Sequence, residues 1–198
     1  AFIVPTDTPG FVVQRVEKKL GIRASDTCAI ALENCTIPEA NLLGPRGKGL
    51  AIALSNLEGG RIGIAAQALG IGRAAFEAAL AYAKERVQFG KPIGAFQALQ
   101  HRATDMLAEI ELTRSAVYAA LQAIDEDAND IATLVSMAKA LAGKTLRHIA
   151  QEMVQMHGGI GMTDEHDAGL YLKRAHAADV TFGNIAFHRE RFASLAGF

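Results

Sequence analysis

A helical pattern that fills most of the chain between residues 47 and 158 limits the fold more than any other feature of this sequence. Apolar residues recur on one face of each of three segments, as they do in amphipathic helices. These segments predict long helices over residues 47–89, about 95–127 and about 130–157. Three long amphipathic helices with short connections are typical of an up-down helical bundle.

Glycine and proline mark where we expect this pattern to stop or bend. Gly90 and Pro92 should end the first helix, because glycine caps helices and proline cannot continue them. Asn129 or Asp130 is a plausible N-cap for the third helix. The pair Gly59–Gly60 should kink or divide the first helix, at roughly 1 kcal/mol for each glycine relative to alanine. Such a cost fits either close helix packing or the close approach of a ligand.

The segments on either side of the helices have a different pattern. Residues 2–4, 11–16 and 28–35 predict strands, and the polar residues 19–27 between two of them predict a loop over a site. Three strands are marginal on their own, so we expect them to belong to a larger β domain whose earlier part is missing. After the bundle, we expect a short helix over about 164–176, capped by Thr163 or Asp164. A loop over 179–184 and a terminal helix over 185–198 complete the prediction.

Composition and charge exclude several classes of function. The net charge is −1 and the basic residues are scattered, which disfavours binding to nucleic acid or to an anionic membrane. Apolar runs fall well short of the ~20 residues of a membrane span. Two cysteines, Cys28 and Cys35, do not make a disulfide framework and favour a reducing, intracellular setting. The sequence lacks P-loop, Rossmann, zinc and nucleophile-elbow motifs, so we expect no metal site.

Two short segments are candidate binding sites. Residues 155–163 hold three glycines in four positions, which leave backbone N–H groups open to an anion such as a pyrophosphate. On this segment alone, a helix cap followed by a tight turn is the favoured interpretation, because glycine after a helix is common. Arg86 and Phe89 stand at a helix end, where cations are favourable in any case. The alternative is that Arg86 binds a phosphate and Phe89 packs against a ring.

Taken together, these segments resemble the acyl-CoA dehydrogenase superfamily in order and spacing over essentially the whole chain. The resemblance rests on residues 7–11 (DTPGF), 19–27 (KLGIRASDT), 38–44 (PEANLLG), 60–62 (GRI), 85–92 (ERVQFGKP), 97 (Q) and 155–161 (QMHGGIG). It implies that residues 1–46 are the last part of the family's middle β domain. Residues 47–198 are then its C-terminal helical bundle, so the implied fold is mainly α with a few preceding strands from an incomplete β domain.

The resemblance also implies a set of site residues. Arg86 and Phe89 would meet the pyrophosphate or adenine side of FAD, with Gln97 near the same cofactor. The residues that would line the FAD of a neighbouring subunit are Gln155, Met156, His157, Gly158 and Gly159. Those that would lie by the acyl-CoA substrate are Ser25, Arg61 and Gly183.

The chain departs from the family at the position of the catalytic base. The family removes the α-proton of an acyl-CoA with a glutamate, usually in a Tyr-Glu-Gly-Thr motif. The matching residues 181–184 read Thr-Phe-Gly-Asn, and the phenyl ring of Phe182 cannot accept a proton. Some members carry the base just before the arginine of the long helix, where this chain has Gly60. Glu58 and Asp179 are nearby carboxylates, but either needs the backbone to reorient before it can act.

These features lead to one expected function and two alternatives. We expect an FAD-dependent oxidoreductase of fatty acid metabolism that performs the α,β-dehydrogenation of an acyl-CoA, as the base-lacking subunit of a heteromeric enzyme. Electron-transfer flavoprotein would be its electron acceptor, and the enzyme would assemble as a dimer or tetramer. It would be located in the bacterial cytoplasm or the mitochondrial matrix. The alternatives are altered flavin chemistry, such as desulfination or monooxygenation, and a non-enzymatic helical interaction domain.

Overall fold

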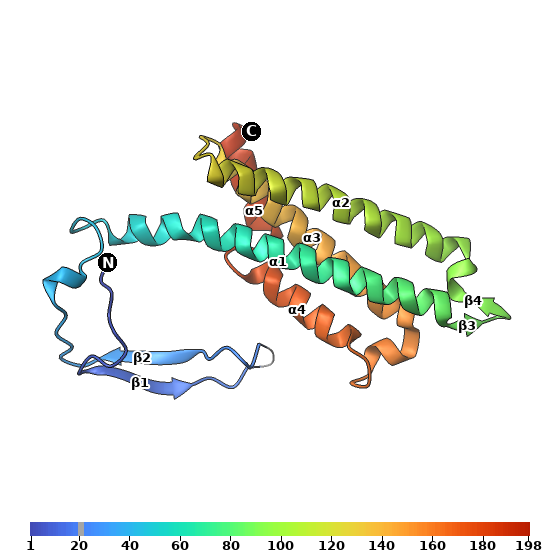
Figure 1. Cartoon of the computed structure of the whole chain (residues 1–198), viewed down its shortest axis with the longest axis horizontal. Helices are drawn as coiled ribbons and strands as arrows, with labels where there is room; N and C mark the ends of the chain where they lie inside the picture. The colour runs from blue at the N-terminus through green and yellow to red at the C-terminus, as the bar shows by residue number, and fades with distance from the viewer. Residues whose placement is uncertain (20–21) are drawn as a thin grey trace. The chain divides into compact units, whose positions relative to one another are not determined.

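The computed structural model describes residues 1–19 and 22–198 and is mainly helical, with a few strands near its N-terminus (Figure 1). This arrangement confirms the predicted fold class. The chain divides into two compact units, Ala1–Leu57 and Glu58–Phe198. Leu20 and Gly21, which belong to the predicted loop over 19–27, lie outside the described residues.

The first unit contains one two-stranded sheet. Strand β1 (Phe11–Val16) pairs antiparallel with β2 (Cys28–Leu32), and the register shifts between Val13 and Arg15. The prediction of a strand over residues 2–4 was wrong, because Phe2 forms only a single bridge, to Leu42. Pro5 follows closely and has no N–H group with which to extend that pairing. A short 3-10 helix, η1 (Glu39–Asn41), precedes the first long helix.

Helix α1 (Gly49–Glu85) runs without a break through Gly59–Gly60, so the predicted division into two helices was wrong. It ends at Glu85, earlier than the glycine and proline signals suggested. The cause is a tight hairpin in which β3 (Val87–Gln88) pairs with β4 (Lys91–Pro92). Phe89 and Gly90 turn this hairpin with φ angles of +53° and +79°, as a turn with two left-handed residues requires.

Two further long helices pack along α1. After the 3-10 helix η2 (Ile93–Ala95), α2 (Gln97–Asp125) and α3 (Ile131–His157) run back and forth, as the periodicity predicted. Asp130 occupies the N-cap position of α3, but its side chain makes no capping hydrogen bond. Figure 1 shows that α2 begins, and α3 ends, at the same end of the bundle as the β3–β4 hairpin.

The last part of the chain forms η3 (Gly158–Met162), α4 (Ala168–Val180) and α5 (Ile185–Ala196). Helix α4 starts four residues after the predicted position, because Thr163 is used in a turn. Its hydroxyl donates to the Ile160 carbonyl and accepts from the Glu165 N–H group, a local bond that competes with helix formation. Helix α4 then continues through Val180 into the predicted loop.

Helix α3 is the centre of the bundle and packs against α2, α4 and α5. Two buried clusters surround it. One is largely alanine, which allows close helix approach, and includes Ile62, Val117 and Leu146; the other includes Phe76, Met106 and Ile149. Full burial of a large aliphatic side chain contributes about 1.5–3 kcal/mol, so these clusters fix the relative positions of the helices that carry the candidate site.

Candidate functional site

The predicted site residues of the second unit fall into two groups near opposite ends of the bundle. The first group lies around the start of this unit and the α4–α5 turn and contains Glu58, Arg61, Asp179 and Gly183. The second lies around the hairpin and the end of α3 and contains Arg86, Phe89, Gln97, Gln155, Met156, His157, Gly158 and Gly159. Arg61 and Glu85, the last residue of α1 and the neighbour of Arg86, are 24 positions apart, or roughly 36 Å at 1.5 Å per helical residue.

Ser25, the remaining predicted residue, belongs to the first unit. It is exposed, and its backbone N–H group donates to the Ile22 carbonyl over 3.2 Å. The ammonium group of Lys19 contacts the Ser25 carbonyl.

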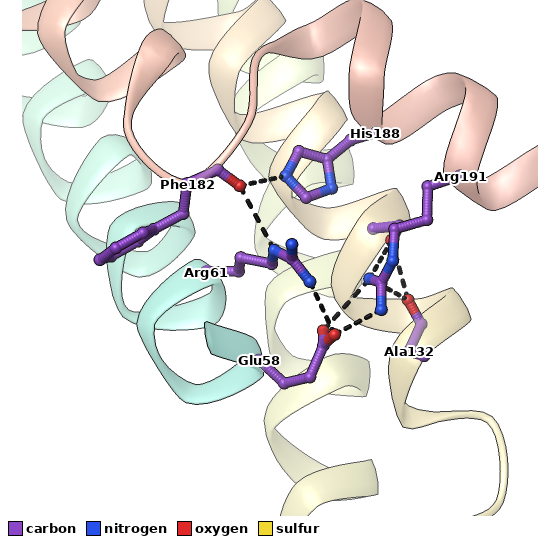
Figure 2. Close-up of polar contacts among 7 residues, drawn as sticks. Glu58, Arg61, Ala132, Phe182, His188 and Arg191 are labelled. Atoms are coloured by element: carbon purple, nitrogen blue, oxygen red, sulfur yellow. Dashed lines mark hydrogen bonds and ion pairs between the residues drawn. The ribbon is translucent and has the colours of Figure 1, made fainter. Parts of the chain in front are cut away.

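The α4–α5 turn has an unusual backbone. Phe182 has a φ of +58° and Gly183 a φ of +111°, and the former is uncommon for a residue with a side chain. The Phe182 carbonyl accepts hydrogen bonds from His188 Nε2 at 3.1 Å and from Arg61 Nε at 3.3 Å (Figure 2). Donors from α5 and α1 thus hold this strained residue in place.

The ring of Phe182 lies against Gly60 on α1. A Cβ atom built on Gly60 would lie only 2.9 Å from Phe182 Cε2, a distance at which one of the two residues must move. The glycine that looked like a helix breaker therefore makes room for an aromatic ring more than a hundred positions later in the chain. Phe182 and Gly60 are also the two positions at which a catalytic carboxylate was sought in the sequence, and they are in contact.

Lys139 is a buried cation beneath the same turn. Its ammonium nitrogen donates to the carbonyls of Ala178, Asp179 and Gly183 at 3.0, 3.1 and 3.0 Å. Burial lowers the pKa of Lys139, while the Asp179 carboxylate opposes that shift and Arg61 adds to it. The side chain thus joins the last turn of α4 to the residue after Phe182.

Glu58 is fully engaged by two arginines. Its carboxylate accepts from Arg61 Nη1 at 2.7 Å and from Arg191 Nη1 at 3.2 Å, and it also contacts Arg191 Nη2 (Figure 2). Arg191 donates further to Ser136 Oγ at 2.8 Å and to the Ala132 carbonyl at 3.2 Å. Both arginines therefore hold this carboxylate in place, with its oxygens facing α5 and α3.

Asp179 has a similar structural environment. It is 8% exposed, and its Oδ1 accepts the Ile185 N–H group at 3.1 Å at the start of α5. Arg147 approaches its other oxygen at 4.0 Å. This carboxylate therefore helps to join α4 to α5.

His188 is fully buried among cations. Burial lowers its pKa to about 4; the hydrogen bond to Phe182 opposes this shift, and Lys139, Arg61 and Arg191 add to it. The neutral ring donates through Nε2, and Nδ1 has no partner among residues 1–19 and 22–198.

This environment predicts a specific acid sensitivity. In the unfolded chain this histidine has its usual pKa of 6.5, whereas in the folded chain its pKa is about 4. Between these two pH values the unfolded chain therefore binds a proton that the folded chain does not. The free energy of unfolding should therefore fall as pH drops through this window, by up to about 3 kcal/mol. Denaturant titrations between pH 4 and 7 should show a weaker pH dependence in His188→Gln, which keeps a donor for Phe182. Exposed His101 is the matched control, and a His101→Gln protein should follow the wild type; equal curves for all three would contradict the prediction.

The second group is mostly exposed. Phe89, at the tip of the hairpin, is 90% exposed, and its ring meets Phe96 edge-on. Arg86 and Gln97 are exposed as well, and Arg86 forms no ion pair with any residue that the structure describes. An exposed guanidinium three positions from an exposed aromatic ring suits a phosphate next to a planar group.

The glycine segment adds an open backbone surface to this group. Gly158 has a φ of +64° at the end of α3, and a Cβ atom on Gly158 or Gly159 would meet nothing within 4 Å. His157, which precedes Gly158, is buried; its ring stacks on Tyr82 with centroids 4.2 Å apart and lies tilted against His166 with centroids 4.1 Å apart. Burial lowers the pKa of His157, so its ring is a neutral support for this end of α3.

Gln155 and Met156 take different positions on the same helix end. Gln155 is exposed, whereas Met156 is buried and lines an apolar pocket of about 220 Å³ together with Phe76, Leu80 and Met106. The donors around this group fit a pyrophosphate and an aromatic ring system, as FAD would supply, although most of the surface is open to solvent.

Sequence reasoning missed Lys139, His188 and Arg191. Lys139 had a usable signal, since it is the only charged residue between Asp130 and Lys144. The other two gave none, because their partners Phe182 and Glu58 are fixed only when α5 packs against the bundle.

Two further kinds of site were sought among the residues that the structure describes. They contain no group of three or more His, Cys, Asp or Glu side chains placed to hold a metal ion. Among them, also, no helix is both long and apolar enough to cross a membrane.

Comparison with known proteins gives a consistent result. Residues 47–195 match the family model described as the C-terminal domain of acyl-CoA dehydrogenase. An acyl-CoA dehydrogenase of Bacillus subtilis is 42% identical over 189 residues, which are 96% of this chain and 50% of that protein. The chain thus spans about half the length of that relative.

Solved structures agree with the sequence match. Butyryl-CoA dehydrogenase from Megasphaera elsdenii superposes with a TM-score of 0.94 and 35% identity, over 100% of this chain and 51% of that one. A chain from a structural study of the electron transferring flavoprotein of Acidaminococcus fermentans gives a TM-score of 0.93 and 38% identity, over 98% and 51%.

Proposed function

The chain belongs to the acyl-CoA dehydrogenase superfamily, and from this membership we propose that it is part of an FAD-binding subunit that acts on an acyl-CoA thioester. Residues 1–46 would complete the middle β domain, and residues 47–198 form the C-terminal helical bundle. The reaction is α,β-dehydrogenation, in which a base takes a proton from the α-carbon. The flavin, when bound, accepts the hydride from the β-carbon.

One observation carries the finer part of this proposal. By the family resemblance, Phe182 and Gly60 correspond to the two positions at which the superfamily carries its base, and these two residues contact each other. A phenyl ring against a glycine has no proton acceptor. We therefore propose that a related subunit of a heteromeric enzyme supplies the base. Glu58 and Asp179 do not replace it in this account, because their oxygens are used by Arg61, Arg191 and the start of α5.

The proposed cofactor residues also argue for an oligomer. Arg61 and the end of α1, which Arg86 follows directly, are separated by roughly 36 Å, which is too far for both arginines to touch the same reacting centre. The hairpin and glycine residues would then hold the pyrophosphate and adenine side of FAD in a neighbouring subunit. Their exposure in the single chain supports this division, since a second chain would have to cover them.

Within the proposed site, this chain's own residues orient the substrate and exclude water. Arg61 is nine-tenths buried and donates to Glu58 and to the Phe182 carbonyl. Its proposed role is therefore to hold the α4–α5 turn in place on the substrate side of the site. Gly183 would contact the acyl-CoA from the α4–α5 turn, and the assignment of Ser25 to the substrate rests on the family resemblance alone. Electron-transfer flavoprotein is the proposed acceptor, which the similarity to a chain from the Acidaminococcus study supports.

A visible absorption spectrum tests this proposal directly. The complete protein is purified alone and with any partner that co-purifies, and acyl-CoA is added without oxygen. The proposal expects a flavin band that acyl-CoA bleaches only when the partner is present. A flavin band that no acyl-CoA bleaches would instead favour altered flavin chemistry. Absence of flavin from both samples would overturn the enzymatic proposal and leave a helical interaction domain.

A further inference from the structure

We infer that Lys139 is a positioning residue that fixes the α4–α5 turn and, through it, the direction of the side chain at position 182. The contacts that carry this inference are independent of the activity. Only the statement that position 182 faces the reacting atoms rests on the proposed function.

The ammonium group of Lys139 has as many N–H donors as there are carbonyl acceptors around it. Lys139 is 2% exposed, so its nitrogen has little access to water. An ammonium has three N–H donors, and three carbonyls lie within 3.1 Å, from Ala178, Asp179 and Gly183. Two of these carbonyls belong to the last turn of α4, where a cation is favoured by the helix dipole. The third belongs to the turn itself, so one atom ties the turn to the helix before it.

A connection that only had to link α4 to α5 would not require this arrangement. Burying an ammonium group is costly unless every hydrogen bond is made, and an apolar side chain would fill the same space at less cost. Three helices nevertheless each direct a donor at the carbonyls of two consecutive residues: Arg61 and His188 at Phe182, and Lys139 at Gly183. A strained backbone conformation that several hydrogen bonds stabilise is typical of a residue whose side chain must point in one direction.

The direction that results is visible in the contacts of the ring. With Phe182 and Gly183 both at positive φ, the Phe182 side chain leaves the turn towards Gly60 on α1. Asn184 then starts α5 by accepting the Phe187 N–H group at 2.9 Å. Loss of the donor at Gly183 would allow the turn to relax towards ordinary φ values, and the side chain at 182 would leave Gly60.

The test compares three complete proteins: wild type, Lys139→Met, which keeps the length but removes the donors, and Lys144→Met. Lys144 is a matched control because it is an exposed lysine on the same helix, 3.1 Å from Glu109. Amide hydrogen exchange is followed by mass spectrometry over residues 178–187 and over α2. We expect the 178–187 amides of Lys139→Met to exchange about 10- to 100-fold faster, the factor for losing hydrogen bonds to a charged group. The α2 amides and the Lys144→Met protein should not change.

A kinetic measurement separates positioning from general support. In proteins that also carry Phe182→Glu, Lys139→Met should lower kcat per bound flavin about tenfold or more with little change in KM, and Lys139→Arg should restore part of it. A purely structural role would lower the yield of folded, flavin-loaded protein but leave kcat per flavin unchanged. Unchanged exchange at the turn, or unchanged kcat per flavin, would overturn the inference.

Failure of the missing-base proposal and failure of the Lys139 inference give different experimental results. If Phe182→Glu gives no dehydrogenation at all, the missing-base proposal fails, and the exchange comparison alone decides the role of Lys139. If Lys139→Met does not accumulate in folded form, Lys139→Gln keeps one donor and is used in its place. Faster exchange in that protein supports the inference, and exchange equal to the wild type rejects it.

Discussion

Phe182→Glu in the complete, flavin-loaded protein is expected to accelerate flavin reduction by an acyl-CoA about 10²- to 10⁴-fold, the range that a positioned general base contributes. The substituted side chain would leave a turn that Arg61, His188 and Lys139 already hold. It would also replace the ring that lies against Gly60. The measurement is the rate of loss of the flavin band after rapid mixing without oxygen, in the absence of any partner subunit.

Phe182→Gln is the matched control for this gain. It has almost the same shape as the glutamate and accepts no proton, so it should remain as slow as the wild type. Gly60→Glu offers a second test, because it places the carboxylate on α1 instead. Alone it should fail, since its Cβ atom would lie 2.9 Å from the ring, whereas combined with Phe182→Gly it should gain activity. A Phe182→Glu protein that binds flavin yet gains nothing over Phe182→Gln would refute the missing-base account.

The helices of this chain could be predicted because their signal is local. Apolar residues at helical spacing define α2 and α3 without knowledge of any partner, and Gly158 marks the end of α3. The errors arose where distant residues decide. Gly59–Gly60 reads as a helix breaker, yet α1 continues because Phe182 covers Gly60 from the far end of the sequence.

The candidate site divides in the same way. A family pattern pointed to Arg86, Phe89 and the glycine segment, and each of these is local in sequence. The residues that hold position 182 in place are not local in sequence. His188 and Lys139 donate to backbone carbonyls, which carry no sequence signature. A lone cation in an uncharged stretch, such as Lys139 between Asp130 and Lys144, can be recognised as unusual, but its partners depend on how α4 and α5 pack.

Glu58→Gln is expected to lower the free energy of unfolding by about 2–4 kcal/mol, the largest loss of stability that we expect from a single conservative change in this unit. Glu58 is the negative charge between Arg61 and Arg191, and without it two guanidinium groups face each other with little water between them. Breaking a fully buried ion pair costs about 3–5 kcal/mol, and the remaining exposure of these side chains, between 11% and 23%, reduces that figure. Chemical denaturation at pH 7 measures the change.

The same variant decides whether Glu58 could be the missing base. Glu77→Gln, on the exposed face of the same helix, removes a carboxylate that pairs with Arg73 at 2.7 Å and should leave stability essentially unchanged. If Glu58 is structural, Glu58→Gln destabilises the protein, while the flavin reduction rate of the folded complex with its partner stays the same. The opposite result, normal stability with flavin reduction abolished, would make Glu58 the base. That result would also remove the need for a second subunit, because a carboxylate released from Arg61 and Arg191 would then reach the α-proton from within this chain.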